Sequence, residues 1–566
     1  MSDTTARPRK QPSVHRLPLA APLRLARPSD MWLKPASSVV VATAIPNLVL
    51  FSVDRLDLVM YTMAGSLCAL YGHSLPYARR ARSVAGVVLG MLAGLAVSLV
   101  TASLTGSTAV LIAVGALLAA GQKLFCDATR IGPPGPLIFT FVSSAALFAP
   151  QHLGQVPGHL ALTLGAGAVS WLVTVAGPAL VRREGPERHA TARALNAAAA
   201  HAADPGHGTR RAAVAAVHAA WQTLLAAGRP TPVRRALERL VVHAEAALAA
   251  DGGAPATTDP AVLRDWAART RARGPVPTPP AAPGTAAELF GIEAERAVLR
   301  PTGPGEARRA LLRRLGPGSP LLPIAARALI GCALAGYVSS AAGVGRPYWA
   351  IVTAASLYQA NVTLSWNRTL QRTVGNLIGV LVFAAVLPVT RTGPLALIGF
   401  CLFFSFAAEA LITRNYWLGS VAVTPMALLV LEYAGSHPAG ELMGDRVLDT
   451  VIGASAGFLA AMLVTNRRAA GRVEAALAAA ELARAHAVQT LAAPGRSPAA
   501  LEAARRRLTG SLVELRDADD TAAGEWWQRD LPQEEVLAAE QAGHRTLAAT
   551  AMRQGLIAPA PENGAV

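Results

Sequence analysis

Residues 75–90 read LPYARRARSVAGVVLG, and residues 364–379 read LSWNRTLQRTVGNLIG. At one constant offset, four residue types coincide: Leu75, Arg79, Gly86 and Gly90 fall on Leu364, Arg368, Gly375 and Gly379. In each segment an arginine-rich turn leads into an apolar run that carries two glycines four residues apart. The match indicates an internal repeat. Because both copies begin on the same side of the membrane, we expect parallel repeats related by an axis along the membrane normal, with a cavity between them.

Apolar runs surround both segments in groups of six. They lie at roughly 36–53, 56–72, 84–103, 107–125, 136–150 and 157–181, and at roughly 321–342, 348–363, 374–390, 394–413, 416–434 and 447–465. Each run is near the length needed to cross about 30 Å of hydrocarbon. The sequence therefore predicts an all-α membrane protein with about 12 transmembrane helices, arranged as two parallel six-helix repeats with helical cytoplasmic domains after each repeat.

Polar segments divide the chain into five parts. A basic cytoplasmic segment at 1–35 precedes the first membrane repeat at 36–181. A block at 182–318, rich in Ala, Arg, Glu and His and interrupted by Pro/Gly linkers, separates it from the second repeat at 319–465. A similar polar block at 466–566 ends the sequence. The composition and apolar spacing of both blocks favour helical cytoplasmic domains.

The charge distribution predicts an orientation in the membrane. Only 15% of residues are charged, against about 25% in soluble domains, and the net charge is +17. Arginines gather in the loops on one predicted side, at Arg79, Arg80, Arg82, Arg130, Arg368, Arg372 and Arg414, and are scattered on the other, at Arg55, Arg346, Arg391 and Arg446. The positive-inside rule then predicts a multi-pass protein of the plasma or inner membrane with both termini cytoplasmic. This distribution argues against nucleic acid as a partner.

Missing motifs exclude several classes of function. The sequence holds no G-x-x-x-x-G-K-[ST] phosphate-binding loop, so the chain is not its own ATPase. The four cysteines are scattered singly, and no group of histidines has metal-ligand spacing. We therefore expect no cofactor, no bound metal and no enzymatic activity. Transport by this chain would draw on an ion gradient or on a partner.

Two stretches of the second half carry a family resemblance. Residues 346–379 read RPYWAIVTAASLYQANVTLSWNRTLQRTVGNLIG, and residues 414–433 read RNYWLGSVAVTPMALLVLEY. The Arg-Pro-Tyr-Trp start at 346–349, and the arginine-rich turn that leads into a Gly-x-x-x-Gly helix, resemble the fusaric acid resistance family of bacterial inner-membrane proteins, which includes aromatic acid exporters. The first half departs from this pattern, because it lacks the Tyr-Trp pair.

The resemblance implies a secondary transporter that exports small aromatic or amphipathic organic acids in a gradient-driven cycle. Its partners would be membrane lipid, a small organic anion and, in a host with two membranes, a periplasmic adaptor protein; a homo-oligomer is left open. The alternative is a non-transport membrane scaffold that binds partners or anionic lipid through its helical domains. A major-facilitator carrier also has six plus six helices, but the loop at 72–83 lacks that family's Gly-x-x-x-Asp-Arg pattern.

Glu409 is the first candidate for substrate binding or proton coupling. It lies inside an apolar run, where a carboxyl group is costly and marks a functional site by default. Its carboxyl group could carry a proton through the membrane. The alternative is a residue near the cytoplasmic end of its helix that reaches water or pairs with Arg414.

Arginine and aromatic side chains give further candidates. Arg368 and Arg372 lie four residues apart and share one helix face, so they would attract an organic anion to a cytoplasmic mouth or contact lipid phosphate. Tyr348 and Trp349 lie at a predicted membrane edge, which is typical of an aromatic belt; stacking on an aromatic substrate is the alternative.

Amides and glycines complete the candidate set. Gln359, Asn361 and Asn367 lie in or near the second and third helices of the second half, where they would line a cavity or link helices. The glycine pairs Gly86/Gly90 and Gly375/Gly379 are expected to let helix backbones approach closely.

Overall fold

The computed structural model describes the following residues: 19–25, 32–129, 131–181, 184–227, 231–248, 259–272, 274–279, 321–464, 469–495, 497–525 and 531–554, with isolated positions between 309 and 319. Arg130 and most of the predicted segment 1–35 lie outside these residues. Within them the chain is helical and contains no strand.

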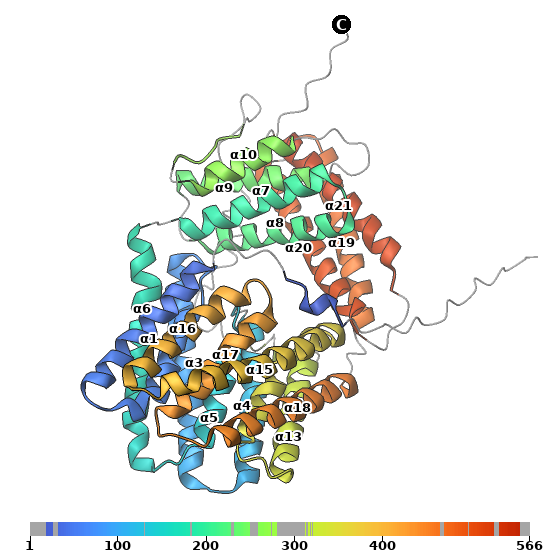
Figure 1. Ribbon diagram of the computed structural model, residues 1–566. Helices are drawn as coiled ribbons and strands as arrows, with labels where there is room; N and C mark the ends of the chain where they lie inside the picture. Colours follow the sequence, from blue (N-terminus) through green and yellow to red (C-terminus); the bar gives the residue numbers. More distant parts are fainter. Residues whose placement is uncertain are drawn as a thin grey trace, which may run out of the picture.

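Each of the twelve apolar runs contains a helix. The first half holds α1 (Leu33–Ser52), α2 (Val59–Ser66), α3 (Tyr77–Leu104), α4 (Thr108–Thr129), α5 (Leu137–Leu147) and α6 (Val156–Val181). The second half holds α13 (Leu321–Ala341), α14 (Tyr348–Ala355), α15 (Val362–Thr390), α16 (Pro394–Ile412), α17 (Tyr416–Glu432) and α18 (Ala439–Leu463). Figure 1 shows these helices gathered in one part of the molecule.

Eight of the described helices are long and apolar enough to cross a membrane, whereas the sequence predicts about twelve. The shorter ones are α2, α5, α14 and α17, which are the second and fifth helices of each half. The run at 348–363 shows the cause of the difference. Its helix α14 ends at Ala355, and the side chain of Asn361 caps the next helix by accepting a hydrogen bond from the Leu364 amide. Apolar composition continues across this break, so composition alone does not reveal it.

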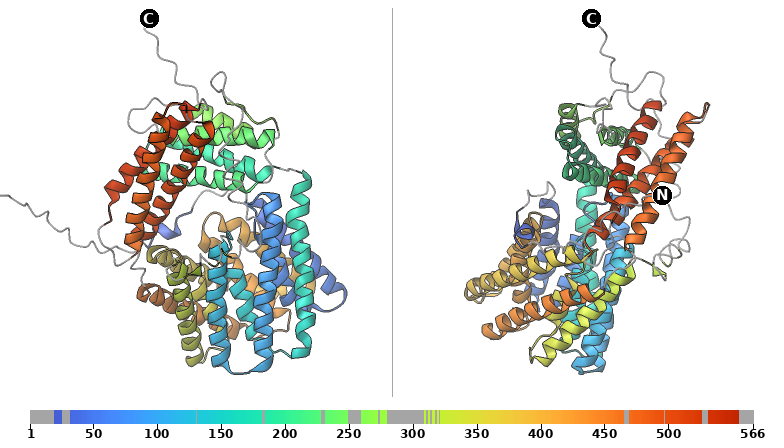
Figure 2. Two further views of the ribbon diagram at one scale, coloured as in Figure 1. Left: turned by 180° about the vertical axis from the view of Figure 1, so that it is seen from behind. Right: turned by 90° about the vertical axis from the view of Figure 1, so that its right-hand side faces the viewer.

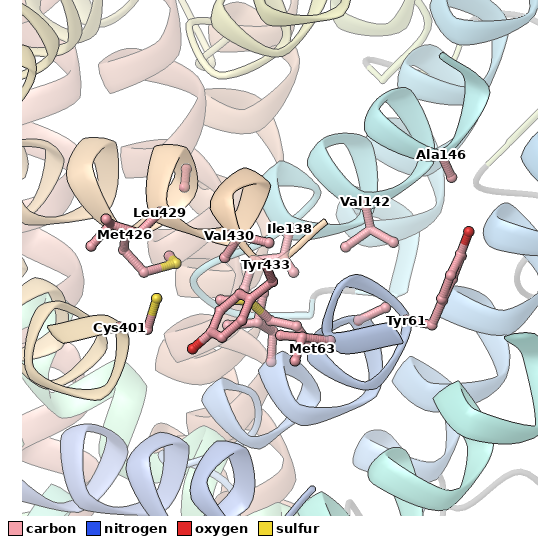
Figure 3. Close-up of a cluster of buried hydrophobic side chains, with 14 of the residues drawn as sticks. Tyr61, Met63, Ile138, Val142, Ala146, Cys401, Met426, Leu429, Val430 and Tyr433 are labelled. Carbon is pink, nitrogen blue, oxygen red and sulfur yellow. The ribbon is translucent and has the colours of Figure 1, made fainter. Parts of the chain in front are cut away.

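Corresponding helices of the two halves make corresponding contacts. Within the first half α3 packs against α5 and α6, and within the second half α15 packs against α17 and α18. Between the halves α1 packs against α16 and α4 against α13, while α14 contacts α5 and α17 contacts α2. The first helix of each half thus meets the fourth helix of the other, and the second meets the fifth. Figure 3 shows the resulting apolar core, to which both halves contribute.

The two polar blocks pack together into one helical body. It consists of α7 (Gly185–Ala203), α8 (His207–Ala226), α9 (Pro232–Ala247) and α10 (Pro260–Arg271) from the first block, and α19 (Ala469–Ala492), α20 (Pro498–Ala523) and α21 (Gln533–Arg553) from the second. Helix α9 packs against α21, and α8 packs against α20. The buried Arg505 of α20 forms ion pairs with Glu245 of α9 and with Glu502. Figures 1 and 2 show this body at one end of the membrane helices.

The end of α20 attaches the helical body to the second half. The Arg327 guanidinium of α13 donates to both carboxylate oxygens of Glu525, at 3.0 and 2.9 Å, and both side chains are buried. Asn361 donates to the carbonyl of Asp520, and the Thr363 amide donates to the carbonyl of Gly524. We call this end of the membrane helices the body end, and the opposite end the far end.

Candidate functional site

A central cavity lies between the two halves. The first half contributes apolar side chains to it, including Val39, Leu67, Leu137, Ile138 and Phe141. The second half contributes Trp349, Met426 and three charged residues: Arg372, Glu409 and Arg446. Charged groups at this depth are costly in a membrane protein and are usually retained for function. The cavity is therefore the candidate functional site.

Glu409 lines the central cavity from α16. Its side chain is half-buried, and it makes no ion pair or hydrogen bond with any described residue. Arg414, the partner considered from the sequence, is exposed and forms no ion pair with Glu409. Glu409 thus faces the central cavity and does not pair with Arg414, and its part in substrate binding or proton coupling stays a prediction.

Arg372 and Arg368 lie on α15 and both contact Tyr416 of α17. Arg372 is 2% exposed, and its Nη1 donates to the Tyr416 hydroxyl at 3.4 Å. The Arg368 guanidinium lies over the Tyr416 ring, 3.6 Å from the centroid. Only Arg372 lines the central cavity. The shared face expected from their spacing is present, because both arginines contact Tyr416. Arg372 meets its hydroxyl and Arg368 meets its ring.

Arg446 is a correction to the sequence analysis, which placed it in a loop. It lies eight residues into α18 and is 0% exposed. Its guanidinium lies over the Trp349 ring, 4.1 Å from the centroid, and none of its three nitrogens has a hydrogen-bond partner among the described residues. The first eight residues of α18 include Glu441, Asp445 and Arg446, so the apolar run at 447–465 marks only its second part. An arginine and an aspartate three residues apart, Arg446 and Asp449, were the available signal of a helix there.

Asp445 precedes Arg446 on α18 and pairs with Arg346, and Asp449 follows three residues later; neither forms an ion pair with Arg446 within the described residues. The Asp449 side chain is buried and accepts a hydrogen bond from the Ser339 hydroxyl of α13. Its second carboxylate oxygen has no partner in the described part of the chain. The cavity thus keeps an arginine whose charge no neighbouring carboxylate contacts directly.

Tyr348 and Trp349 begin α14 and are both buried in the core. Trp349 stacks against Phe141 of the first half, with ring centroids 5.6 Å apart. An aromatic belt at the membrane edge does not fit these two residues, because neither is exposed to lipid. They belong to the interior path described next.

Two further spaces continue from the central cavity toward the far end. An apolar constriction is lined by Met60, Met63 and Val430 and shares Phe141 and Trp349 with the central cavity. Beyond it lies a larger space, the far vestibule, which shares Met60 and Val430 with the constriction. Figure 3 shows Met63, Val142 and Val430 in the apolar cluster around this constriction.

The far vestibule is more polar than the constriction. Its lining includes Asp57, Glu441, His437 and the ion pair between Arg346 and Asp445, whose atoms are 2.9 Å apart. The three spaces therefore follow one another through shared lining residues: the central cavity with its three charged groups, the apolar constriction, and the far vestibule with its ion pair.

The amide candidates lie outside the central cavity. Asn361 caps α15 and contacts α20, and Gln359 donates to the carbonyl of Tyr358 in the link before α15. Asn367 lies on α15 but does not line the cavity, and its side-chain oxygen has no partner among the described residues. Asn376, in contrast, links helices, because it donates to Thr450 and accepts from Thr424.

Three of the four candidate glycines lie at close helix contacts. A Cβ atom at Gly375 would lie 2.5 Å from the backbone of Trp417, and one at Gly379 would lie 2.6 Å from Thr424. One at Gly90 would lie 3.0 Å from Phe139. Gly86 does not fit the packing interpretation, because nothing described lies within 4 Å of its Cβ position.

The charged side of the central cavity has no counterpart in the first half. At the offset that aligns Leu75 with Leu364, Arg372 corresponds to Ser83, and Trp349 corresponds to Met60. The lack of the Tyr-Trp pair in the first half therefore has a structural consequence. One half provides the charge, and the other provides an apolar wall.

Comparisons with known proteins give one family match and one listed relative. The uncharacterized membrane protein YvaC of Bacillus subtilis (strain 168) is 31% identical over 221 residues, which cover 38% of this chain. The match spans 33% of that relative's length. No solved structure matches the chain. Residues 333–460, which include Arg372, Glu409 and Arg446, match the family described as fusaric acid resistance protein-like.

Proposed function

We propose that this chain is a secondary transporter that moves small organic anions through the path between its two halves. The observation that carries the proposal is the central cavity, which two arginines and a glutamate line between the halves. The family match of residues 333–460 and the absence of a phosphate-binding loop support it. The substrates we propose are small aromatic or amphipathic acids, which are exported.

We also propose that the membrane region is a parallel duplication of six helices, twelve in all, four of them shorter than a full crossing. The reciprocal contacts support this arrangement, because α1 meets α16 as α13 meets α4. A pseudo-two-fold axis along the membrane normal would pass between the halves, where the central cavity lies. The helical body would lie in the cytoplasm, since it shares an end with the arginine-bearing α15.

In this mechanism the substrate enters the central cavity from the body end. Its carboxylate is attracted by Arg372 and Arg446, and its apolar part packs against Phe141 and the other apolar walls. The constriction opens when the halves move relative to each other, because Phe141 and Trp349 close it from opposite halves. The far vestibule then receives the anion.

Glu409 would couple this cycle to a proton gradient. It faces the cavity without a partner among the described residues, so its charge state alters the net charge that the substrate meets. Replacement by glutamine keeps the shape of the side chain and removes the titratable group. A transporter that depends on this group then loses coupling while it stays folded.

The experiment compares retention of a panel of hydroxylated aromatic acids in cells with and without the protein, with a protonophore as a second condition. We expect lower retention with the wild type, loss of that effect with the protonophore, and loss with Glu409→Gln. Glu481→Gln, which changes an exposed residue of α19, is the matched control. Equal retention across the whole panel would contradict transport and favour a scaffold that acts through the helical body.

A further inference from the structure

Arg446 is the most unusual charged residue of the central cavity. An arginine guanidinium stays protonated in proteins and presents five N–H donors. At Arg446 the side chain is fully buried, the face of Trp349 lies against the charge, and none of the guanidinium nitrogens has a hydrogen-bond partner among the described residues. A buried charge that lacks a hydrogen-bonded partner destabilises the fold. Such a residue is retained where a bound ligand supplies the missing partner.

We propose that Arg446 is the principal anion ligand of the central cavity and that it takes the carboxylate of a small monocarboxylic acid with an apolar body. This inference rests on the proposed function and assigns its recognition step. The charge of the lining supports a monoanion. Arg372 and Arg446 with an ionised Glu409 leave one positive charge without compensation among the groups that line the cavity.

The geometry favours an edge-on carboxylate. One face of the Arg446 guanidinium is covered by Trp349, so its N–H groups point outward in the guanidinium plane, as do those of any guanidinium. A planar carboxylate accepts two such hydrogen bonds in parallel. The rest of the ligand then lies against the apolar walls formed by Leu67, Ile138 and Phe141. An inorganic anion gains nothing from those walls.

Arg446 and Arg372 have different parts in this site. Arg372 already has a partner, since its Nη1 donates to the Tyr416 hydroxyl. Its Nε has no partner among the described residues, so it can add one further hydrogen bond to the ligand. At Arg446 none of the three guanidinium nitrogens has a hydrogen-bond partner within the described structure. We therefore assign the main contact to Arg446 and a supporting contact to Arg372.

The test is direct binding to the purified full chain in lipid nanodiscs, measured by calorimetry. The probe is benzoate, and benzamide is the neutral probe of nearly the same shape; sodium chloride and inorganic phosphate are separate arms. We expect benzoate to bind and the other three not to compete. Arg446→Gln should weaken benzoate binding about 10- to 100-fold, which is the usual range for a lost hydrogen-bonded charge. Arg446→Lys should weaken it less.

Arg391→Gln is the control, because Arg391 is a partly exposed arginine that pairs with Glu432 at the far end. Equal binding of benzamide, displacement of benzoate by phosphate, or equal affinities in the Arg446→Gln and Arg391→Gln proteins would each overturn the assignment. Circular dichroism and a melting curve establish that each variant is folded. Specific benzoate binding without export by cells would leave this assignment standing and overturn the proposed function. If the Arg446→Gln protein still exports the acids and binds benzoate unchanged, the assignment is overturned and the proposed function stands.

Discussion

The guanidinium of Arg327 and the carboxylate of Glu525 form a buried ion pair that joins α13 to the residues after α20. The same guanidinium donates from Nε to the carbonyl of Val464 at 2.7 Å, close to the end of α18. One arginine thus holds the helical body, the first helix of the second half and the end of its last helix. This connection places the helical body next to the link between α14, which carries Trp349, and α15, which carries Arg372.

Breaking this pair on one side should destabilise the protein strongly. Glu525→Gln leaves the Arg327 charge buried, and such a change typically costs about 3–5 kcal/mol. The double replacement Arg327→Met with Glu525→Met removes both charges and should cost much less. Chemical denaturation of the full chain, followed by circular dichroism, compares the three proteins. A double variant less stable than Glu525→Gln would show that the pair contributes more than the removal of an uncompensated charge.

Replacing Arg446 by Met should stabilise the fold. The change removes a buried charge that no described carboxylate contacts, and replacements of buried charges by apolar residues gain about 1–4 kcal/mol where they pack well. If Arg446 is kept for structure, Arg446→Met should instead lower the stability, because the loss of its contact with Trp349 then dominates. Melting temperatures of the wild type and Arg446→Met in the same nanodiscs decide between the two. A lower melting temperature contradicts a functional reason for this buried arginine.

Gly375 and Gly86 should respond differently to the same substitution. An alanine at Gly375 meets the backbone of Trp417 and the Cβ atom of Ser420 at 2.5 Å, so α15 and α17 must separate. The expected cost is about 1–3 kcal/mol. At Gly86 an alanine has free space and raises helix propensity, so stability should be unchanged or increase by up to about 1 kcal/mol. Denaturation of both variants checks the contrast, and equal losses would refute it.

The sequence predicted the positions of the helices better than their lengths. Apolar composition locates each run, because lipid and the protein core select the same residues, but it does not reveal the break before Asn361 or the polar start of α18. The candidate site was predicted in part. Glu409 stands out because it lies in an apolar run, and Arg372 because it lies in the repeated segment. Arg446, in contrast, follows polar residues that predict a loop. Its neighbour Trp349 lies far away in sequence, and only tertiary packing brings them together.

The joining of the two polar blocks was also beyond the sequence. Both blocks are alanine-rich and a six-helix repeat separates them in the sequence, so each is predicted to be a separate helical domain. Their contact depends on single buried groups such as Arg505 and Glu245, which belong to different blocks. Pairing of this kind has no local signal, because a charged residue on a helix usually faces water.

His544 should make the stability of the helical body depend on pH. Burial, with Arg210, His201 and Arg516 nearby, lowers the pKa of His544 to about 3 from an ordinary value of about 6.5. Between these values the unfolded chain binds a proton at this site and the folded chain does not, so stability is complete above about pH 6.5 and falls as the pH decreases. At pH 5 the loss from this group is about 2 kcal/mol. The free energy of unfolding of the full chain should therefore differ less between pH 5 and pH 7.5 for His544→Gln than for the wild type. His486→Gln, at an exposed position of α19, should keep the full difference, and a wild-type pH dependence retained in His544→Gln would assign the effect to another group.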